Sequence, residues 1–493
     1  MNLARLGEES VQTWGEYVAL AFEGREWTNV EQQRAADRFA RALRRIGLAP
    51  GDRVAVLLPN CPEVLQAYAG ILKAGGVIVP LVFLLGAPEV RHILADAEAK
   101  IVVTAPALLD KVQGGPGVVV LVGGGAGGLA WDALLEAEAD TPSTVERADD
   151  DLAVILYTAG TTGRPKGVAL SHANLAANAR AAAILYELDR TAWGLVVLPL
   201  SHSYGLTVMN AASILGTRGV LLRWFNPEGV LEAIQRYRVA SMSAVPTMFV
   251  YLLHYPDADR FDTSSMRVWG SGAAPLPLEI VEPFERRFGG RILEGYGLTE
   301  ASPVVSAHRL SGVRKLGSVG QPIPGVEVTI RDEADHPLPA GELGEVCVRG
   351  PNVMLGYYRL PEETARTVRE GWLHTGDMGR LDGDGYLYLV ERKKDLIIRG
   401  GFNIYPREVE EVLYAHPAVA EAAVVGMRDP LMGEDVLAFV ALKPGATTEA
   451  AALIGFCEER LARYKCPKQV RFLDALPKSP VGKILRKELR SLA

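Results

Sequence analysis

Up to about residue 310, short apolar runs alternate with longer amphipathic segments. The apolar periodicity at 30–46 predicts a helix that ends at Gly47, and the run at 52–59 predicts a strand. The same order continues with a helix at 62–74, a strand at 76–80, a helix at 89–97 and a strand at 101–104. Short apolar strands that alternate with helices predict parallel sheets with helices on their faces. We therefore expect an α/β fold with a large N-terminal domain of doubly wound sheets.

The pattern changes after residue 317. Short β-rich runs at 326–330, 344–348 and 385–390 lie between turn signals, which predicts a small β-barrel-like unit. The charged cluster at 391–395 then predicts a linker. Beyond it we expect a mobile small α+β domain with helices at 406–414 and 448–463 and strands at 421–425, 436–442 and 468–472. The predicted domains are residues 1–391 and 392–493.

Composition and charge narrow the classes of function. The 493 residues carry a net charge of −7, which argues against a nucleic-acid partner. Four cysteines are scattered without metal spacing, and a disulfide framework is unusual at this size, so we expect a reduced, cytoplasmic location. The N-terminal residues lack the apolar core of a signal peptide, and no transmembrane segment is expected.

A loop at 157–167 is the strongest chemical signal. Its sequence, Tyr157-Thr158-Ala159-Gly160-Thr161-Thr162-Gly163-Arg164-Pro165-Lys166-Gly167, combines three glycines, three threonines and a lysine, which can wrap around a polyphosphate. An apolar strand precedes it, and Ser171 is a candidate helix N-cap after it, so we expect strand, loop and helix. The P-loop motif does not fit, because Pro165 and Gly167 occupy required Gly and Ser/Thr positions. A surface turn is the alternative interpretation.

Four more motifs follow this loop in order. They are Glu294-Gly295-Tyr296-Gly297-Leu298-Thr299-Glu300, Gly371-Trp372-Leu373-His374-Thr375-Gly376-Asp377, the run at 391–406, and Pro477-Lys478-Ser479-Pro480-Val481-Gly482-Lys483-Ile484. Together with the loop they resemble the motifs of the adenylate-forming (AMP-binding) enzyme superfamily, and the resemblance covers almost the whole chain. Within the superfamily, the chain resembles the acyl-CoA synthetase branch, which includes fatty-acyl-CoA and 4-coumarate-CoA ligases. Residues 1–391 would then be the adenylation domain, and 392–493 would carry the catalytic lysine.

The resemblance implies a reaction in two halves that uses ATP, Mg²⁺ and coenzyme A. A carboxylate attacks the α-phosphorus of ATP, which gives acyl-adenylate and pyrophosphate, and a thiol then attacks the activated carbonyl. Phosphoryl transfer of this kind depends on positioning and charge neutralisation. The resemblance makes Lys483 the residue that bridges the carboxylate and the α-phosphate, and Lys394 the hinge of the small domain.

The motif side chains offer a contact for each part of the nucleotide. Thr299 can donate to the α-phosphate, Glu300 and Thr161 offer hard oxygen ligands for Mg²⁺, and Tyr296 offers a flat ring to adenine. Asp377 can accept hydrogen bonds from both ribose hydroxyls. The predicted contacts of ATP and coenzyme A are Thr158, Ala159, Gly160, Thr161, Thr162, Lys166, Gly272, Ala273, Ala274, Glu294, Gly295, Tyr296, Gly297, Asp377, Arg392, Lys394, Gly400 and Gly401.

The acid pocket is expected beside His202, which by the resemblance can rotate between closing the site and opening the thiol path. The predicted acid contacts are His202, Tyr204, Val245, Ser271, Gly297, Pro303 and Val304. The segments around them hold no Lys or Arg, and a buried second carboxylate needs a cation, which argues against dicarboxylic and amino acids. Tyr204 can bond a phenolic substituent, as the matching tyrosine does in hydroxycinnamate ligases. We expect a medium- or long-chain fatty acid first, and an aryl acid such as a hydroxycinnamate or benzoate next.

Other functions share parts of this pattern. A standalone adenylation enzyme that loads a carrier-protein thiol shares the first half-reaction, and a luciferase-like oxygenase shares the fold. A catalytically inactive binding scaffold is the third alternative, against which the intact Lys483, Glu300, Asp377 and Thr161 argue. The oligomeric state is open, with a homodimer among the expected forms.

Overall fold

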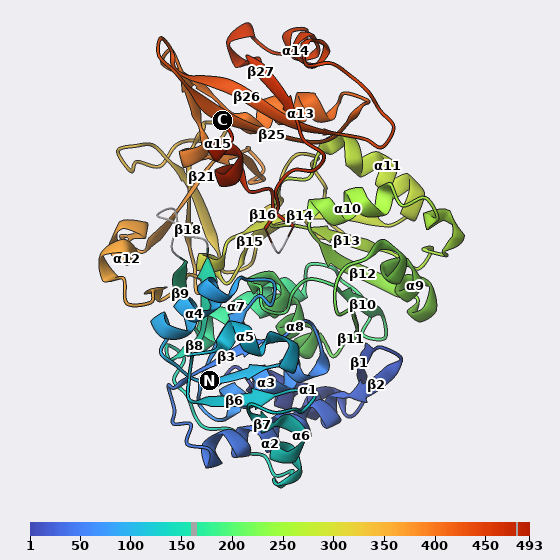
Figure 1. The fold of residues 1–493 in the computed structure, drawn as a ribbon, viewed down its shortest axis with the longest axis vertical. Coiled ribbons are helices and arrows are strands. Elements are labelled where there is room, and N and C mark those ends of the chain that lie inside the picture. The colour runs from blue at the N-terminus through green and yellow to red at the C-terminus, as the bar shows by residue number, and fades with distance from the viewer. Residues whose placement is uncertain (159–164, 480–481) are drawn as a thin grey trace.

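The computed structural model describes residues 1–158, 165–479 and 482–493. Over these residues the chain forms two large sheets, an antiparallel unit and a separate small domain, which Figure 1 shows at the top in orange and red. This arrangement confirms the expected α/β architecture. None of the helices in the described ranges is both long and apolar enough to cross a bilayer.

Both large sheets have a parallel centre. In the described residues the first has nine strands in the order β16-β15-β14-β13-β12-β10-β11-β1-β2, and the second has eight in the order β19-β9-β8-β4-β3-β5-β6-β7. The strands of the first sheet are β1 (Val18–Phe22), β2 (Arg25–Thr28), β10 (Trp193–Val196), β11 (Arg218–Leu221), β12 (Val239–Ala244), β13 (Val268–Ser271), β14 (Arg291–Gly297), β15 (Val304–Ala307) and β16 (Gln321–Pro322). Those of the second are β3 (Arg53–Leu57), β4 (Val77–Leu81), β5 (Ala99–Thr104), β6 (Val118–Leu121), β7 (Leu129–Ala130), β8 (Leu152–Thr158), β9 (Lys166–Ser171) and β19 (Gly356–Tyr357).

Amphipathic helices cover these sheets, as the apolar periodicity predicts. Helix α2 begins with a complete capping box, in which the Thr28 side chain accepts from the Glu31 N–H and the Glu31 carboxylate accepts from the Thr28 N–H. The helices of the large domain are α1 (Arg5–Trp14), α2 (Asn29–Arg45), α3 (Pro62–Lys73), α4 (Ala87–Asp96), α5 (Leu109–Val112), α6 (Trp131–Glu136), α7 (His172–Ala183), α8 (Ser203–Leu215), α9 (Pro227–Tyr237), α10 (Pro246–Leu253), α11 (Leu278–Phe288) and α12 (Pro361–Thr367).

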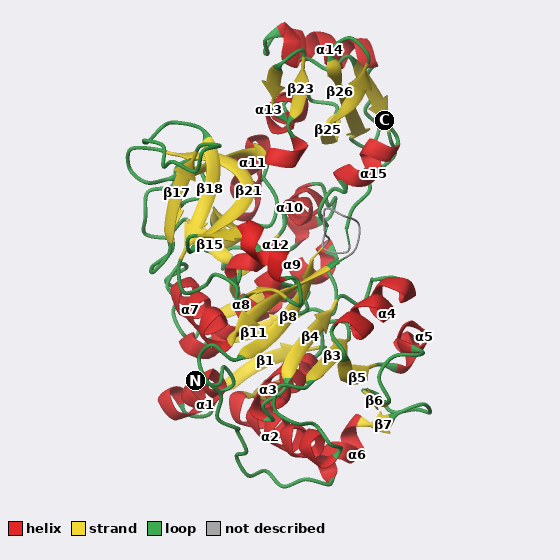
Figure 2. Ribbon diagram, turned by 90° about the vertical axis from the view of Figure 1, so that its left-hand side faces the viewer, coloured by secondary structure: helices red, strands yellow, loops and turns green. Residues whose placement is uncertain are grey.

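The β-rich segment after residue 317 forms the antiparallel unit, which lies beside the two sheets (Figure 2). Its strands are β17 (Glu327–Arg331), β18 (Gly344–Arg349), β20 (Val368–Arg369), β21 (Trp372–Leu381) and β22 (Leu387–Arg392). Buried residues of this unit, including Val346 and Leu373, belong to the same apolar core as the large sheets. The unit is therefore packed as part of the large domain.

The small domain has apolar clusters of its own, between Ile397 and Leu489. Its elements are β23 (Ile397–Arg399), β24 (Phe402–Ile404), α13 (Pro406–Tyr414), β25 (Val419–Asp429), β26 (Gly433–Leu442), α14 (Ala450–Glu458), β27 (Gln469–Phe472) and α15 (Arg486–Ser491). The helix predicted at 448–463 is shorter than expected, because the chain turns after Glu458 and Leu461 packs against the core.

One local expectation is wrong. The loop after β8 does not lead directly into a helix, because Lys166–Ser171 forms strand β9, which pairs antiparallel with β8. Strands β8 and β9 are thus the two arms of a β-hairpin. Ser171 is the N-cap of the following helix, α7, as expected, and its hydroxyl accepts from the Asn174 N–H at 3.1 Å.

Candidate active site

A cavity of about 860 Å³ lies between the large sheets and the small domain. Strands β12, β13 and β14 run parallel and end at it, and the small domain contributes the loop around Lys483. A crevice at the carboxyl ends of parallel strands is the usual ligand site of open α/β sheets. Of the predicted contacts, those that line the cavity are Thr158, His202, Tyr204, Gly272, Ala273, Ala274, Glu294, Gly295, Tyr296, Gly297, Thr299, Glu300, Pro303, Val304, Asp377, Arg392, Lys394 and Lys483.

Lys483 enters this cavity from the small domain. Its backbone is fixed by a turn in which the Ser479 N–H donates to the Lys483 carbonyl at 2.7 Å, and the Thr247 hydroxyl donates to the Gly482 carbonyl at 3.4 Å. Burial and the charge of Arg392 lower the pKa of Lys483 to about 8, while Asp377 and Glu300 act in the opposite direction. The Lys483 ammonium is therefore close enough to Arg392, Asp377 and Glu300, which belong to three different motifs, for their charges to affect its pKa.

Asp377 is aimed at the cavity by a β-bulge. Strands β18 and β21 pair Glu345 with Met378 and Cys347 with His374, so the three residues 375–377 of β21 lie opposite a single residue of β18. The Asp377 carboxylate accepts a hydrogen bond from the Tyr296 hydroxyl at 2.6 Å and lies 3.1 Å from the Arg392 Nε. Burial and this carboxylate raise the pKa of Tyr296, so its hydroxyl stays protonated.

The sequence did not identify Glu345, which holds this bulge. The Glu345 carboxylate accepts the Gly376 N–H at 3.0 Å and lies 3.5 Å from the Lys393 ammonium. Gly376 has a φ of +71°, which favours glycine. Because Glu345 is separated from the Thr-Gly-Asp motif by some thirty residues, only the strand pairing brings the two together.

Glu300 and Lys166 lie beside the hairpin. The Glu300 carboxylate accepts a hydrogen bond from the Tyr357 hydroxyl at 2.9 Å, which leaves oxygen lone pairs free to face the cavity. Hard carboxylate oxygens suit Mg²⁺, so Glu300 fits the predicted metal ligand. Lys166 forms an ion pair with Glu363 and lies outside the cavity lining. The predicted contacts Ala159, Gly160, Thr161 and Thr162 lie outside the described residues.

His202 lines the cavity at the start of α8. Its Nδ1 accepts the Tyr204 N–H at 3.2 Å and so acts as the N-cap of α8. Burial and the charge of Lys483 lower the pKa of His202 to about 4. The ring is therefore neutral near pH 7, and the N-cap bond assigns its proton to Nε2.

Beyond His202 the cavity continues along the whole length of α8. The helix residues that face it are Ser203, Tyr204, Thr207, Val208, Ala211, Ala212 and Leu215. Opposite them, Gly219, Gly194 and Ser241 lie side by side on three neighbouring strands. A Cβ on Gly194 would meet its nearest atom, the Ser241 Oγ, at 3.4 Å, which is an ordinary van der Waals contact, so a Cβ fits there without a clash.

The sequence missed two polar features of this channel. The Tyr186 hydroxyl lies 3.2 Å from the Ser243 Oγ, and both residues line the channel with Tyr204. Arg218 lines the far end, with its guanidinium 5.7 Å from the centre of the Trp193 ring. Arg218 lies outside the segments around the predicted acid contacts, so the absence of Lys and Arg from those segments does not describe the whole cavity lining. The sequence pattern around Arg218 predicts only that it lies in a strand, and gives no sign that it lines the cavity.

Besides Lys166, four described residues among the predicted contacts lie outside the cavity lining. Val245 and Ser271 are buried just behind the cavity wall, next to the lining residues Pro246 and Gly272. Gly400 and Gly401 form the turn of the β23–β24 hairpin on the small domain, away from the cavity lining. A contact between these glycines and a pantetheine arm would need another orientation of the small domain.

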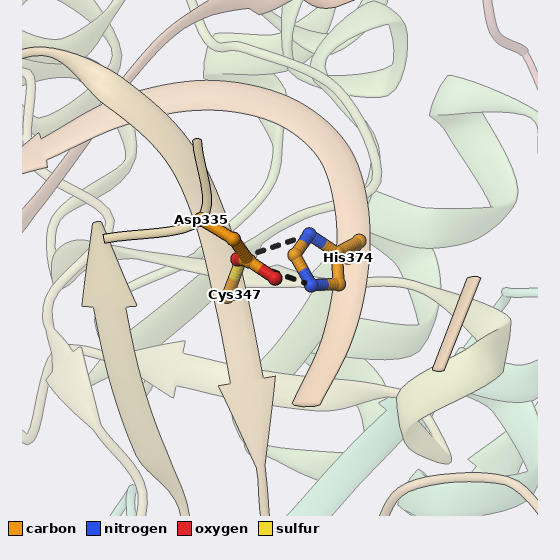
Figure 3. Close-up of side chains that lie close together, drawn as sticks. All are labelled: Asp335, Cys347 and His374. Carbon is orange, nitrogen blue, oxygen red and sulfur yellow. Dashed lines mark hydrogen bonds and ion pairs between the residues drawn. The ribbon is translucent and has the colours of Figure 1, made fainter. Parts of the chain in front are cut away.

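A second cluster of potential metal ligands lies under the Asp377 bulge. Figure 3 shows Asp335, Cys347 and His374 close together, with the Cys347 Sγ 3.4 Å from the His374 Nδ1. Arg369 donates to the same Nδ1 at 2.6 Å, and Arg331 pairs with Asp335 at 3.3 Å. Two guanidinium groups repel a cation, so we interpret the cluster as a structural support of the bulge.

Comparisons with known proteins agree with this geometry. The AMP-binding enzyme family model matches residues 7–358, and the model of the AMP-binding enzyme C-terminal domain matches 408–483. The chain belongs to the AMP-binding enzyme family. It is 39% identical to the long-chain-fatty-acid–CoA ligase of Bacillus subtilis (strain 168), over 98% of this chain and 92% of that protein. It is also 39% identical to a feruloyl-CoA synthase of an Amycolatopsis species, over 96% and 95% of the two chains.

Solved structures of the family superimpose on the whole chain. The ATP-bound MatB of Rhodopseudomonas palustris matches with a TM-score of 0.92 and 34% identity, over 100% of this chain and 99% of MatB. The anthranilate CoA ligase AuaEII in complex with anthranoyl-AMP matches with a TM-score of 0.94 and 28% identity, over 100% and 97%. The protein is thus an AMP-forming acid–thiol ligase, an acyl-CoA synthetase that uses ATP, Mg²⁺ and coenzyme A.

Proposed function

We propose that this ligase activates medium- and long-chain fatty acids. The observation that carries the proposal is the channel along α8. Every turn of this helix contributes at least one residue to the channel lining. A helix of 13 residues is about 20 Å long, so the channel offers room for an extended acyl chain. Its walls are mostly apolar or glycine, which suits a methylene chain because burial of each CH₂ is favourable by about 0.8 kcal/mol.

The carboxylate of the acid would lie near His202, where the channel meets Lys483. There the Lys483 ammonium would stabilise the negative charge that develops as the carboxylate oxygen bonds to the α-phosphorus and pyrophosphate leaves. Asp377 would hold the ribose, Tyr296 the adenine, and Glu300 the magnesium ion, which neutralises phosphate charge when bound. With a pKa of about 8, Lys483 is protonated in roughly nine of ten molecules at pH 7.

In the second half-reaction the coenzyme A thiolate attacks the acyl carbon and AMP leaves. We propose that the large domain ends at residue 391 and that the small domain comprises residues 392–493. The small domain would turn about Lys394 and bring Gly400 and Gly401 towards the cavity. The neutral His202 would then leave the thiol path by rotating its ring.

A panel of acids tests the substrate assignment. AMP formation with ATP and coenzyme A is measured for hexanoate, dodecanoate, hexadecanoate, hexadecanedioate, ferulate and benzoate. The proposal predicts the highest kcat/KM for dodecanoate or hexadecanoate. A higher kcat/KM for ferulate or benzoate would reject it, and a preference for the dicarboxylate would assign Arg218 to a second carboxylate.

An aryl acid is the second candidate, because three hydroxyl groups meet in the channel. Tyr186, Ser243 and Tyr204 can form hydrogen bonds to a phenolic substituent. Burial raises the pKa of Tyr204, so its hydroxyl stays protonated and can donate.

Loading of a carrier-protein thiol is the remaining alternative. It predicts faster AMP formation with a holo-carrier protein than with coenzyme A. A cytoplasmic location and a homodimer stay predictions.

A further inference from the structure

A buried group of charges joins the lysine loop to the boundary between the domains. Arg486 lies three residues after Lys483 and begins α15. Its NH1 donates to the Glu391 Oε1 at 2.8 Å, and its NH2 contacts the two Glu410 oxygens at 2.8 and 2.7 Å. The Asp395 carboxylate lies 3.6 Å from the NH1. The Glu391 side chain is only 4% exposed.

Glu410 belongs to the small domain, whereas Glu391 belongs to the large domain. Glu410 is on α13 of the small domain, and its Oε1 also accepts the Val424 N–H at 2.7 Å within that domain. Glu391 is on β22, which pairs with β21 of the large domain. The Arg486–Glu391 contact therefore ties the lysine loop to the large domain, whereas the Arg486–Glu410 contact stays inside the small one.

Glu391 also caps a helix of the small domain. Its Oε2 accepts the backbone N–H of Arg407 at 3.1 Å, in the first turn of α13, where the N-cap residue Tyr405 makes no side-chain bond. The Arg407 NH1 donates to the Leu389 carbonyl of β22 at 2.8 Å. A carboxylate at a helix N-terminus is favourable for both hydrogen bonding and the helix dipole.

We propose that Glu391 is a positioning residue for acid activation, which keeps Lys483 in the cavity by fixing Arg486 and the start of α13 to the large domain. This inference rests on the proposed role of Lys483. The other contacts near Lys483 across the boundary are weaker. The Thr247–Gly482 bond is 3.4 Å long, and the Lys478–Tyr251 bond at 3.0 Å is exposed to solvent. The buried, charge-assisted bonds of Glu391 are stronger.

The test compares Glu391→Gln with Glu410→Gln, a matched control that weakens the same arginine pair inside the small domain. Acid activation is measured as pyrophosphate release with dodecanoate and ATP in single turnover without coenzyme A. Thiol transfer is measured as dodecanoyl-CoA formation from synthetic dodecanoyl-adenylate. For Glu391→Gln we expect activation to fall by roughly tenfold, the effect of one lost charge-assisted bond, and transfer to change by less than about twofold. For Glu410→Gln the ratio of the two rates should stay unchanged.

Two results would overturn the proposal. The first is that Glu391→Gln lowers acid activation and thiol transfer equally, or lowers neither of them. The other is the same selective loss in Glu410→Gln. Thermal unfolding checks that each variant is folded, and Glu391→Asp, which withdraws the carboxylate, replaces Glu391→Gln under the same criteria if the latter does not fold. Absence of pyrophosphate release by the wild-type protein would instead reject the proposed substrate.

Discussion

Lys483 should lose its proton near pH 8 in the free protein, because burial and the Arg392 guanidinium both disfavour its charged form. The ordinary value for a lysine is about 10.4. At pH 8 about half of the Lys483 side chains would then be neutral, whereas an ordinary exposed lysine is neutral in roughly one molecule in 250. The neutral amine is the nucleophile, so the labelling of Lys483 should rise at a lower pH than the labelling of its exposed neighbours.

Competitive acylation measures this directly. The protein is treated briefly with a trace of acetic anhydride between pH 6 and 11, and the modified peptides are quantified by mass spectrometry. Exposed Lys487 on α15 serves as the internal reference. We expect the Lys483 labelling curve to have its midpoint near pH 8, and Mg²⁺ with ATP to move it to higher pH because phosphate charge favours the ammonium. Arg392→Met should also raise the midpoint, since it removes a nearby positive charge.

A midpoint above pH 10 in the free protein would refute the reasoning, because burial and the Arg392 charge would then not lower the pKa of Lys483. An Arg392→Met variant with an unchanged or lower midpoint would refute the assignment of the cause.

Three further predictions concern other parts of the molecule. Asp377→Asn should raise the KM for ATP by roughly tenfold or more, and Tyr296→Phe by less, because only the first removes the charged acceptor; initial rates at varied ATP concentration decide this. Lys73→Met should lower the free energy of unfolding by about 3–5 kcal/mol in urea titration, because Lys73 is buried against Asp37 at 2.7 Å and its loss leaves a buried carboxylate unpaired; a loss below about 1 kcal/mol would contradict this. Lys394→Pro should slow thiol transfer while sparing pyrophosphate release, and unchanged turnover with coenzyme A would reject its role as hinge.

Sequence patterns predicted the architecture wherever the signal was local. The helix at Pro406–Tyr414 was expected with the bounds that the structure has, because Pro406 sets its start and an apolar stripe follows. Strand β9 was not expected. Its apolar residues 168–170 precede an N-cap, and a run this short does not distinguish a strand from the approach to a helix.

In the candidate site, too, the sequence indicated the residues of local motifs but not the contacts between distant segments. Tyr296 and Asp377 belong to separate motifs, and the motifs indicated that both contact the nucleotide. Their direct hydrogen bond at 2.6 Å depends on a bulge that only the strand register reveals. Arg218 had no local signal, and the run at 391–406 marked Glu391 only as the first residue of a motif. Each lies in a strand, and its neighbours come from segments far away in the chain, so tertiary structure alone gives them their surroundings.

The most direct test of the central claim is to narrow the channel at Gly194. A valine there is sterically possible, because its Cβ would lie 3.4 Å from the Ser241 Oγ, and it would project into the path proposed for the acyl chain. Gly117→Val, at an exposed loop with open space around it, is the control. The measurement is kcat/KM for hexanoate and hexadecanoate in AMP formation. The account predicts that Gly194→Val lowers the value for hexadecanoate by at least roughly tenfold while hexanoate is little changed. Equal effects on both acids would show that the chain does not follow α8.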